Sequence, residues 1–204
     1  MLEPISTTIQ DVINFTWPMV IISCVIMISF RLSYLITHKE KIIIYKELFM
    51  LIFGIYILCL FQIVTFQDGT LWASNNFIPF QEIMRYNINS RLFFKNVVGN
   101  MLLFMPFGFF ASYYLKSEKA RLPIFLTLIA SVSIELVQLS IGRVFDVDDI
   151  ILNLLGGFIG YITYSIIRII GEPLPKFCKS DWFLNVLSIL LLLGLISVIF
   201  IILV

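Results

Sequence analysis

The sequence predicts an all-α fold, a polytopic transmembrane bundle of about six spans with both termini extracytoplasmic. Hydrophobic residues make up 60% of the 204 residues and charged residues only 13%, about half the charged fraction of a soluble domain. Mean hydropathy is +1.00. Apolar stretches of about 20 residues are long enough to cross the hydrocarbon core of a bilayer. Six such stretches lie at 17–37, 48–66, 92–115, 122–141, 149–170 and 183–204.

The spans divide the chain into four segments. These are two N-terminal spans at 1–66, an extracytoplasmic or interfacial loop at 67–91, a three-helix core at 92–170, and a cytoplasmic loop with the last span at 171–204. Ten of the 14 Lys and Arg residues belong to the first, third and fifth connections. The positive-inside rule places these connections in the cytoplasm. Both termini, and the connection between the fourth and fifth spans, then face outward.

Several function classes lack the residues they need. A net charge of +1 provides no concentrated basic face, so we expect no nucleic-acid partner. Cys24, Cys59 and Cys178 have no metal-ligand spacing, and the single histidine, His38, lies in a charged loop. We therefore assign no metal ligand among these residues and predict no zinc cluster and no serine–histidine or cysteine–histidine nucleophile system. The residues leave both a cofactor and a protein partner undetermined, and the partners that the composition implies are membrane lipids.

One polar run interrupts the apolar sequence between the fourth and fifth spans. A carboxylate within a membrane costs several kcal/mol unless it is paired, and such groups mark functional sites. Glu135 and Gln138 share one face of the fourth span, three residues apart. We therefore expect the function to reside here. The polar residues of the run are Glu135, Gln138, Arg143, Asp146, Asp148, Asp149 and Asn153.

Amides of the third span are expected to join this run. Asn96 and Asn100 are one helical turn apart, which places them on one face. The short connection after the fourth span predicts an antiparallel hairpin that sets Gln138 level with Asn153. Three helices would thus bring polar groups to a similar depth below the outer surface, around a pocket open to the outside. A GxxxG motif in the fifth span lets a neighbouring backbone approach closely.

Residues 75–165 contain an ordered set of motifs: Asn76-Phe-Ile-Pro79-Phe80, Asn96-x3-Asn100, Phe104-Met-Pro106-Phe-Gly108, Glu135-x2-Gln138, Arg143-x2-Asp146-x2-Asp149 and Asn153-x2-Gly156-x3-Gly160. Through these motifs the chain resembles the VanZ-like membrane protein family. The resemblance implies a multispanning protein of the cell envelope, in a Gram-positive-type plasma membrane. It also implies an association with resistance to glycopeptide antibiotics, notably of the teicoplanin type. The family has no settled biochemical activity.

The leading hypothesis is an outward-facing pocket that binds or acts on a lipid-linked or cell-wall component. Glu135 and Asp149 are the candidate catalytic carboxylates, with Glu135 as acid or base. Whether the protein is an enzyme stays open, because no reaction can be named from the residues. The candidate substrate-binding residues are Asn96, Asn100, Gln138, Arg143, Asp146 and Asn153.

Each of these residues also has a structural interpretation. Glu135 could accept a hydrogen bond from Asn100 or pair with Arg143, as a clamp between helices. The aspartates could hold a divalent cation, or form a solvated turn that contains Asp148 and in which Asp149 caps the fifth helix. Segment 75–83 could be an interfacial lid or a plain connecting loop. At the level of function, the alternatives are a scaffold or sensor for a partner protein and a proton-coupled transporter.

Overall fold

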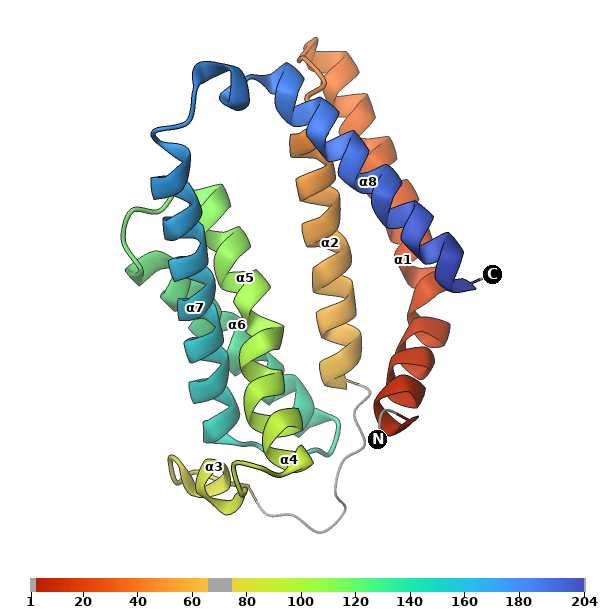
Figure 1. The fold of residues 1–204 in the computed structure, drawn as a ribbon. Coiled ribbons are helices and arrows are strands. Elements are labelled where there is room, and N and C mark those ends of the chain that lie inside the picture. The colour runs from red at the N-terminus through yellow and green to blue at the C-terminus, as the bar shows by residue number, and fades with distance from the viewer. Residues whose placement is uncertain (1–2, 66–74, 204) are drawn as a thin grey trace. The chain divides into compact units, whose positions relative to one another are not determined.

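The protein is almost entirely helical in the computed structural model, which describes residues 3–65 and 75–203 (Figure 1). The described residues contain no β-strand, and a single parallel bridge joins Asn76 to Asp146. The chain forms two compact units, a first unit of Met1–Gln62 with Pro173–Val204 and a second unit of Ile63–Glu172. The elements are α1 (Glu3–His38), α2 (Ile44–Thr65), α3 (Gln81–Arg85), α4 (Arg91–Phe93), the π-helix η1 (Phe94–Val98), α5 (Gly99–Leu115), α6 (Arg121–Ser140), α7 (Val147–Gly171), the 3₁₀-helix η2 (Lys176–Lys179) and α8 (Asp181–Leu203).

Within the described residues, five segments are long and apolar enough to cross a membrane: Trp17–His38, Ile44–Val64, Arg91–Leu115, Arg121–Ser140 and Val147–Gly171. This confirms the all-α, polytopic membrane bundle. The sixth predicted span is found as helix α8, but the apolar part that could be assessed, Asp181–Leu195, is shorter than the other five. The orientation of the bundle remains a prediction.

Helix α7 packs closely against α5 through glycines (Figure 1). A Cβ atom added to Gly156 would overlap the backbone carbonyl oxygen of Met101, and Gly160, one turn further on, meets the α5 backbone in the same way. On α5, a Cβ at Gly108 would overlap the backbone of Gly157. The close approach predicted from the GxxxG motif is therefore confirmed, and the neighbouring backbone is that of α5.

The register of the α6–α7 hairpin differs from the expected one. Asn153 Nδ2 donates to Ser131 Oγ at 2.9 Å, so Asn153 lies level with Ser131, about two helical turns from Gln138. The predicted pairing of Gln138 with Asn153 is wrong because the connection is not a tight turn. Residues 141–146 fold back along α6, and the Asp146 backbone N–H donates to Glu135 Oε2 at 3.0 Å. Helix α7 therefore begins beside Glu135, more than one helical turn before the end of α6 at Ser140.

The third predicted span begins irregularly rather than as one continuous α-helix. Ser90 caps α4 by accepting a hydrogen bond from the Phe93 backbone N–H at 3.1 Å, and the π-helix η1 follows before α5 begins. A π-turn takes more residues per turn than an α-helix. Asn96 lies in this turn and Asn100 lies in the first turn of α5, so the predicted continuous α-helix is interrupted between them.

Candidate functional site

Within the second unit, Asp148 attaches segment 75–85 to the start of α7. Its side chain is only 1% exposed, and its two carboxylate oxygens accept hydrogen bonds from three backbone N–H groups around the start of α3. The donors are Phe80 at 2.5 Å, Glu82 at 2.7 Å and Ile83 at 3.1 Å. The first N–H groups of a helix have no partner within it, and here the carboxylate supplies one. The solvated-turn interpretation of Asp148 is therefore wrong.

Asp146 is the N-cap of α7 and a second attachment point for segment 75–85. Its Oδ1 accepts from the Asp148 backbone N–H at 2.8 Å and from Asn76 Nδ2 at 2.8 Å. Burial raises the pKa of the Asp146 carboxyl above its usual range, although these two hydrogen bonds favour the carboxylate. The alternative in which Asp149 caps the fifth helix is wrong, because α7 starts at Val147, which places Asp149 inside its first turn.

Segment 75–85 thus crosses the end of the α5–α7 bundle as a hydrogen-bonded cover, rather than as a plain loop (Figure 1). Backbone bonds from Asn76 N–H to the Phe145 carbonyl, 2.8 Å, and from Val147 N–H to the Asn76 carbonyl, 3.1 Å, hold its start. Its large apolar side chains are exposed, among them Phe77 at 68% and Met84 at 81%. An exposed apolar surface of this kind is typical of a segment that contacts the interfacial region of a membrane rather than water alone.

Beyond this cover, six of the eight predicted site residues converge on one small cavity of about 20 Å³ in the second unit. We call these six residues the polar cluster. The volume is enough for about one water molecule. Helices α5, α6 and α7 each contribute to the cluster, as the spacing predicted. The polar cluster is Asn100, Glu135, Gln138, Arg143, Asp149 and Asn153, and the cavity wall is completed by Val64, Leu103, Phe104 and Ile134.

Two carboxyl groups face this cavity with separate partners. Glu135 is 1% exposed and is bound by the Asp146 backbone N–H. Asp149 Oδ1 accepts from Asn100 Nδ2 at 2.6 Å, so the amide expected to bind Glu135 binds the other carboxylate. No ion pair joins Arg143 to Glu135 in the part of the chain that the structure describes. Two carboxyl groups beside one guanidinium can take up or release a proton, as acid or base chemistry requires.

Arg143 and Gln138 both bind the end of α2 rather than standing in solvent. Arg143 Nη1 donates to the Val64 carbonyl oxygen at 2.5 Å, and Gln138 Nε2 donates to the same oxygen at 2.8 Å. The last carbonyls of a helix have no partner within it and carry the negative end of its dipole. The guanidinium therefore stabilises this helix end while it lines the cavity.

Asn96 is the predicted site residue that the structure separates most clearly from the others. Its Nδ2 donates to the Tyr86 hydroxyl at 2.8 Å, and it does not line the cavity. Asp146 also lies outside the cavity wall, but it touches the polar cluster through its backbone bond to Glu135. Among residues 3–65 and 75–203, no three His, Cys, Asp or Glu side chains are grouped to hold a metal ion.

Sequence reasoning missed the polar stripe that α6 presents to α7. Thr127 and Ser131 are both 0% exposed and precede Glu135 at intervals of four residues, so the three side chains share one face of the helix. That spacing could have been recognised. The role of Val64 could not, because a backbone carbonyl oxygen leaves no signature in an amino-acid sequence.

An apolar helical bundle with amides and carboxylates buried at its centre defines a polytopic membrane protein with an intramembrane polar site. The chain matches the family model described as VanZ/LLP1 over residues 47–168, more than half of its length, and it belongs to that family. The match begins earlier than the resemblance at 75–165 and includes most of α2, whose last turn lines the cavity. The comparisons with curated proteins and with solved structures found no match to the chain.

Proposed function

We propose that this VanZ/LLP1 protein lowers susceptibility to glycopeptide antibiotics of the teicoplanin type, by binding or acting on a lipid-linked or cell-wall component. It would do so from the plasma membrane of a Gram-positive-type cell, with the polar cluster facing outward. The observation that supports this most is the convergence of six polar side chains on one cavity within an apolar bundle. Burying these groups is costly in a membrane, which favours a use for them.

The geometry restricts how a ligand would reach the polar cluster. A cavity of about 20 Å³ takes one water-sized group, so only a small part of a larger molecule would enter it. Segment 75–85 is bonded to the start of α7 beside this cavity but does not line it. In the binding role we propose, Arg143 contacts an anionic group. In the catalytic role, Glu135 exchanges a proton with the bound component.

A scaffold or sensor for a partner protein is the second candidate, and one observation favours it. The three amides of the polar cluster each donate within the protein: Asn100 to Asp149, Asn153 to Ser131, and Gln138 to the Val64 carbonyl. Interhelical bonds of this kind stabilise membrane bundles by roughly 0.6–2 kcal/mol each. A purely structural polar cluster would tolerate isosteric changes that preserve these bonds.

Replacing Glu135 by glutamine separates the two candidates. The amide keeps the size and the hydrogen-bond acceptor of the side chain but cannot act as an acid or base at neutral pH. We expect a deletion strain complemented with Glu135→Gln to remain as susceptible to teicoplanin as the deletion strain, whereas the wild-type gene restores the lower susceptibility. Lipid and muropeptide profiles of the same strains would show the corresponding chemical change.

The control for this experiment is Glu118→Gln, an exposed residue of the second unit, and all variants are compared at equal abundance in the membrane. If Glu135→Gln lowers teicoplanin susceptibility as much as the wild-type gene does, the acid or base role is excluded. Co-purification of a stoichiometric partner that is retained by Glu135→Gln would then favour the scaffold.

The proposed orientation can be tested by cysteine labelling. In a chain whose native cysteines are replaced by serine, Ser140→Cys is expected to react with a membrane-impermeant maleimide in intact cells. Lys119→Cys, in the basic connection at the other end of α6, should react only after permeabilisation. Both positions are exposed. The opposite labelling pattern would place the polar cluster on the cytoplasmic side and refute the proposed access from outside.

A further inference from the structure

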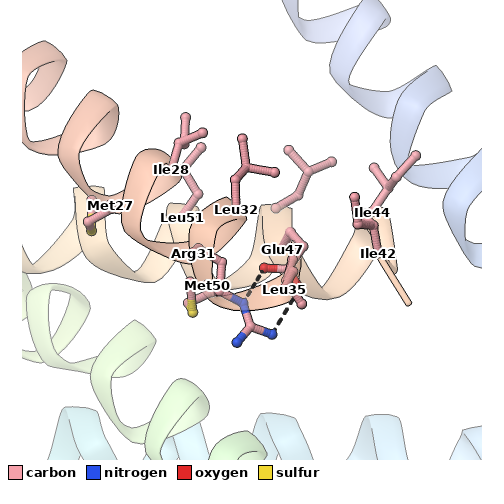
Figure 2. A pocket seen from close by; sticks show the side chains of 11 residues that line it. Met27, Ile28, Arg31, Leu32, Leu35, Ile42, Ile44, Glu47, Met50 and Leu51 are labelled. Atoms are coloured by element: carbon pink, nitrogen blue, oxygen red, sulfur yellow. Dashed lines mark hydrogen bonds and ion pairs between the residues drawn. The ribbon is translucent and has the colours of Figure 1, made fainter. Parts of the chain in front are cut away.

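The first unit contains a separate cavity of about 220 Å³ between α1 and α2 (Figure 2). Nothing in the proposed function uses it. An apolar cavity of about 150 Å³ is already large enough for benzene, so this one has room for several methylene groups. Its lining consists of nine apolar residues and one ion pair: Met27, Ile28, Leu32, Leu35, Ile42, Ile44, Leu48, Met50 and Leu51, with Arg31 and Glu47.

The ion pair leaves the cavity without an unpaired charge that would call for a polar ligand. Arg31 Nε lies 2.8 Å from Glu47 Oε2, and Nη2 lies 3.0 Å from Oε1. This two-point contact joins α1 to α2. In Figure 2 the paired groups point away from Ile28 and Leu32, which form the apolar wall. The lining therefore suits a hydrocarbon chain.

The cavity extends along the half of α1 that ends at the first connection. From Met27 to His38 the helix rises about 16 Å, which is close to half of a hydrocarbon core roughly 30 Å thick. Ile42 and Ile44 line the cavity at the connection, and Met27 lines it near the middle of the span. An acyl chain of one leaflet, with its headgroup at the connection, would have this depth and direction.

The charges at the connection indicate which headgroup. Between positions 31 and 47 the sequence holds four Lys or Arg residues and two Glu. Lys39, Lys41 and Lys46 are exposed, and among the ion pairs described none involves them. Basic side chains beside a membrane attract anionic lipid. We propose that the cavity binds one acyl chain of an anionic phospholipid, whose phosphate is held by these lysines.

Native mass spectrometry of the purified full-length protein tests the headgroup. Phosphatidylglycerol and phosphatidylcholine with the same acyl chains are added separately. We expect phosphatidylglycerol to bind more tightly. Lys41→Gln with Lys46→Gln should weaken its binding about thirtyfold, from the expected contribution of each lysine. The control pair Lys116→Gln with Lys119→Gln removes the same charge from the second unit and should leave binding unchanged. Equal binding of the two lipids, or equal loss in both double variants, would refute the lysine site.

A tryptophan scan tests the cavity itself. Leu32→Trp fills it, whereas Ile36→Trp adds the same ring one turn further along α1, at a side chain that is 73% exposed and does not line the cavity. We expect Leu32→Trp alone to reduce retention of phosphatidylglycerol, at least tenfold. If Leu32→Trp fails to fold, the lysine variants still decide the proposal. Unchanged binding by a folded Leu32→Trp protein would overturn it. Neither result depends on the polar cluster, so the proposed function stands or falls separately.

Discussion

Replacing Gly156 by alanine is expected to lower the free energy of unfolding by about 3 kcal/mol, the upper end of the usual cost of overpacking. In an open helix the same change stabilises a protein by about 0.4–1 kcal/mol, because alanine restricts the unfolded chain. At Gly156 the added Cβ would overlap the Met101 carbonyl oxygen. A backbone atom cannot turn aside as a flexible side chain can, so α5 and α7 would have to separate.

The measurement is the thermal unfolding of the detergent-purified protein, followed by circular dichroism. Gly194→Ala is the matched control, because a Cβ at this position within α8 meets no atom within 4 Å. We expect the two alanine variants to change the melting temperature in opposite directions. A Gly156→Ala protein as stable as the wild type would show that α5 and α7 are less closely packed than described here.

Replacing Asp148 by alanine is expected to release segment 75–85 from the helices. The substitution removes the acceptor of three backbone N–H bonds, and each bond to a charged group contributes about 1.5–3 kcal/mol. The start of α3 would then lack its cap. Because proteolysis follows the population of the open segment, cleavage after Arg85 by trypsin should accelerate by at least on the order of a thousandfold, which corresponds to three such bonds at the lower end of that range.

Digestion of inverted and right-side-out vesicles, with identification of the fragments, would measure this release. Asp148→Asn retains one acceptor oxygen and should lie between the wild type and Asp148→Ala. Glu118→Ala, which removes an exposed carboxylate elsewhere in the second unit, should cleave after Arg85 at the wild-type rate. A similar rate in Asp148→Ala would mean that the hydrogen bonds of Asn76, rather than the Asp148 cap, hold the segment in place.

The sequence was most informative where helical periodicity applied. Apolar length predicted the spans, and the i, i+3 spacing of Glu135 and Gln138 placed both on the buried face of α6. The same reasoning did not find the partner of Asn96, whose amide binds the Tyr86 hydroxyl and does not line the cavity. It also failed for the hairpin, where the register depends on residues 141–146. Their path is set by long-range contacts to Glu135 and Asn76, which local patterns do not contain.

The amino-acid sequence by itself determined the class of this protein, because twenty-residue apolar segments have few alternatives to spanning a bilayer as helices. It also determined that carboxylates and amides from three spans would be buried together. Only the tertiary structure decided the partner of each group. Asn100 binds Asp149, Asp148 caps α3, and the Val64 carbonyl oxygen accepts two hydrogen bonds. These choices depend on the register and separation of the helices, where a shift of a few ångströms exchanges one hydrogen-bond partner for another.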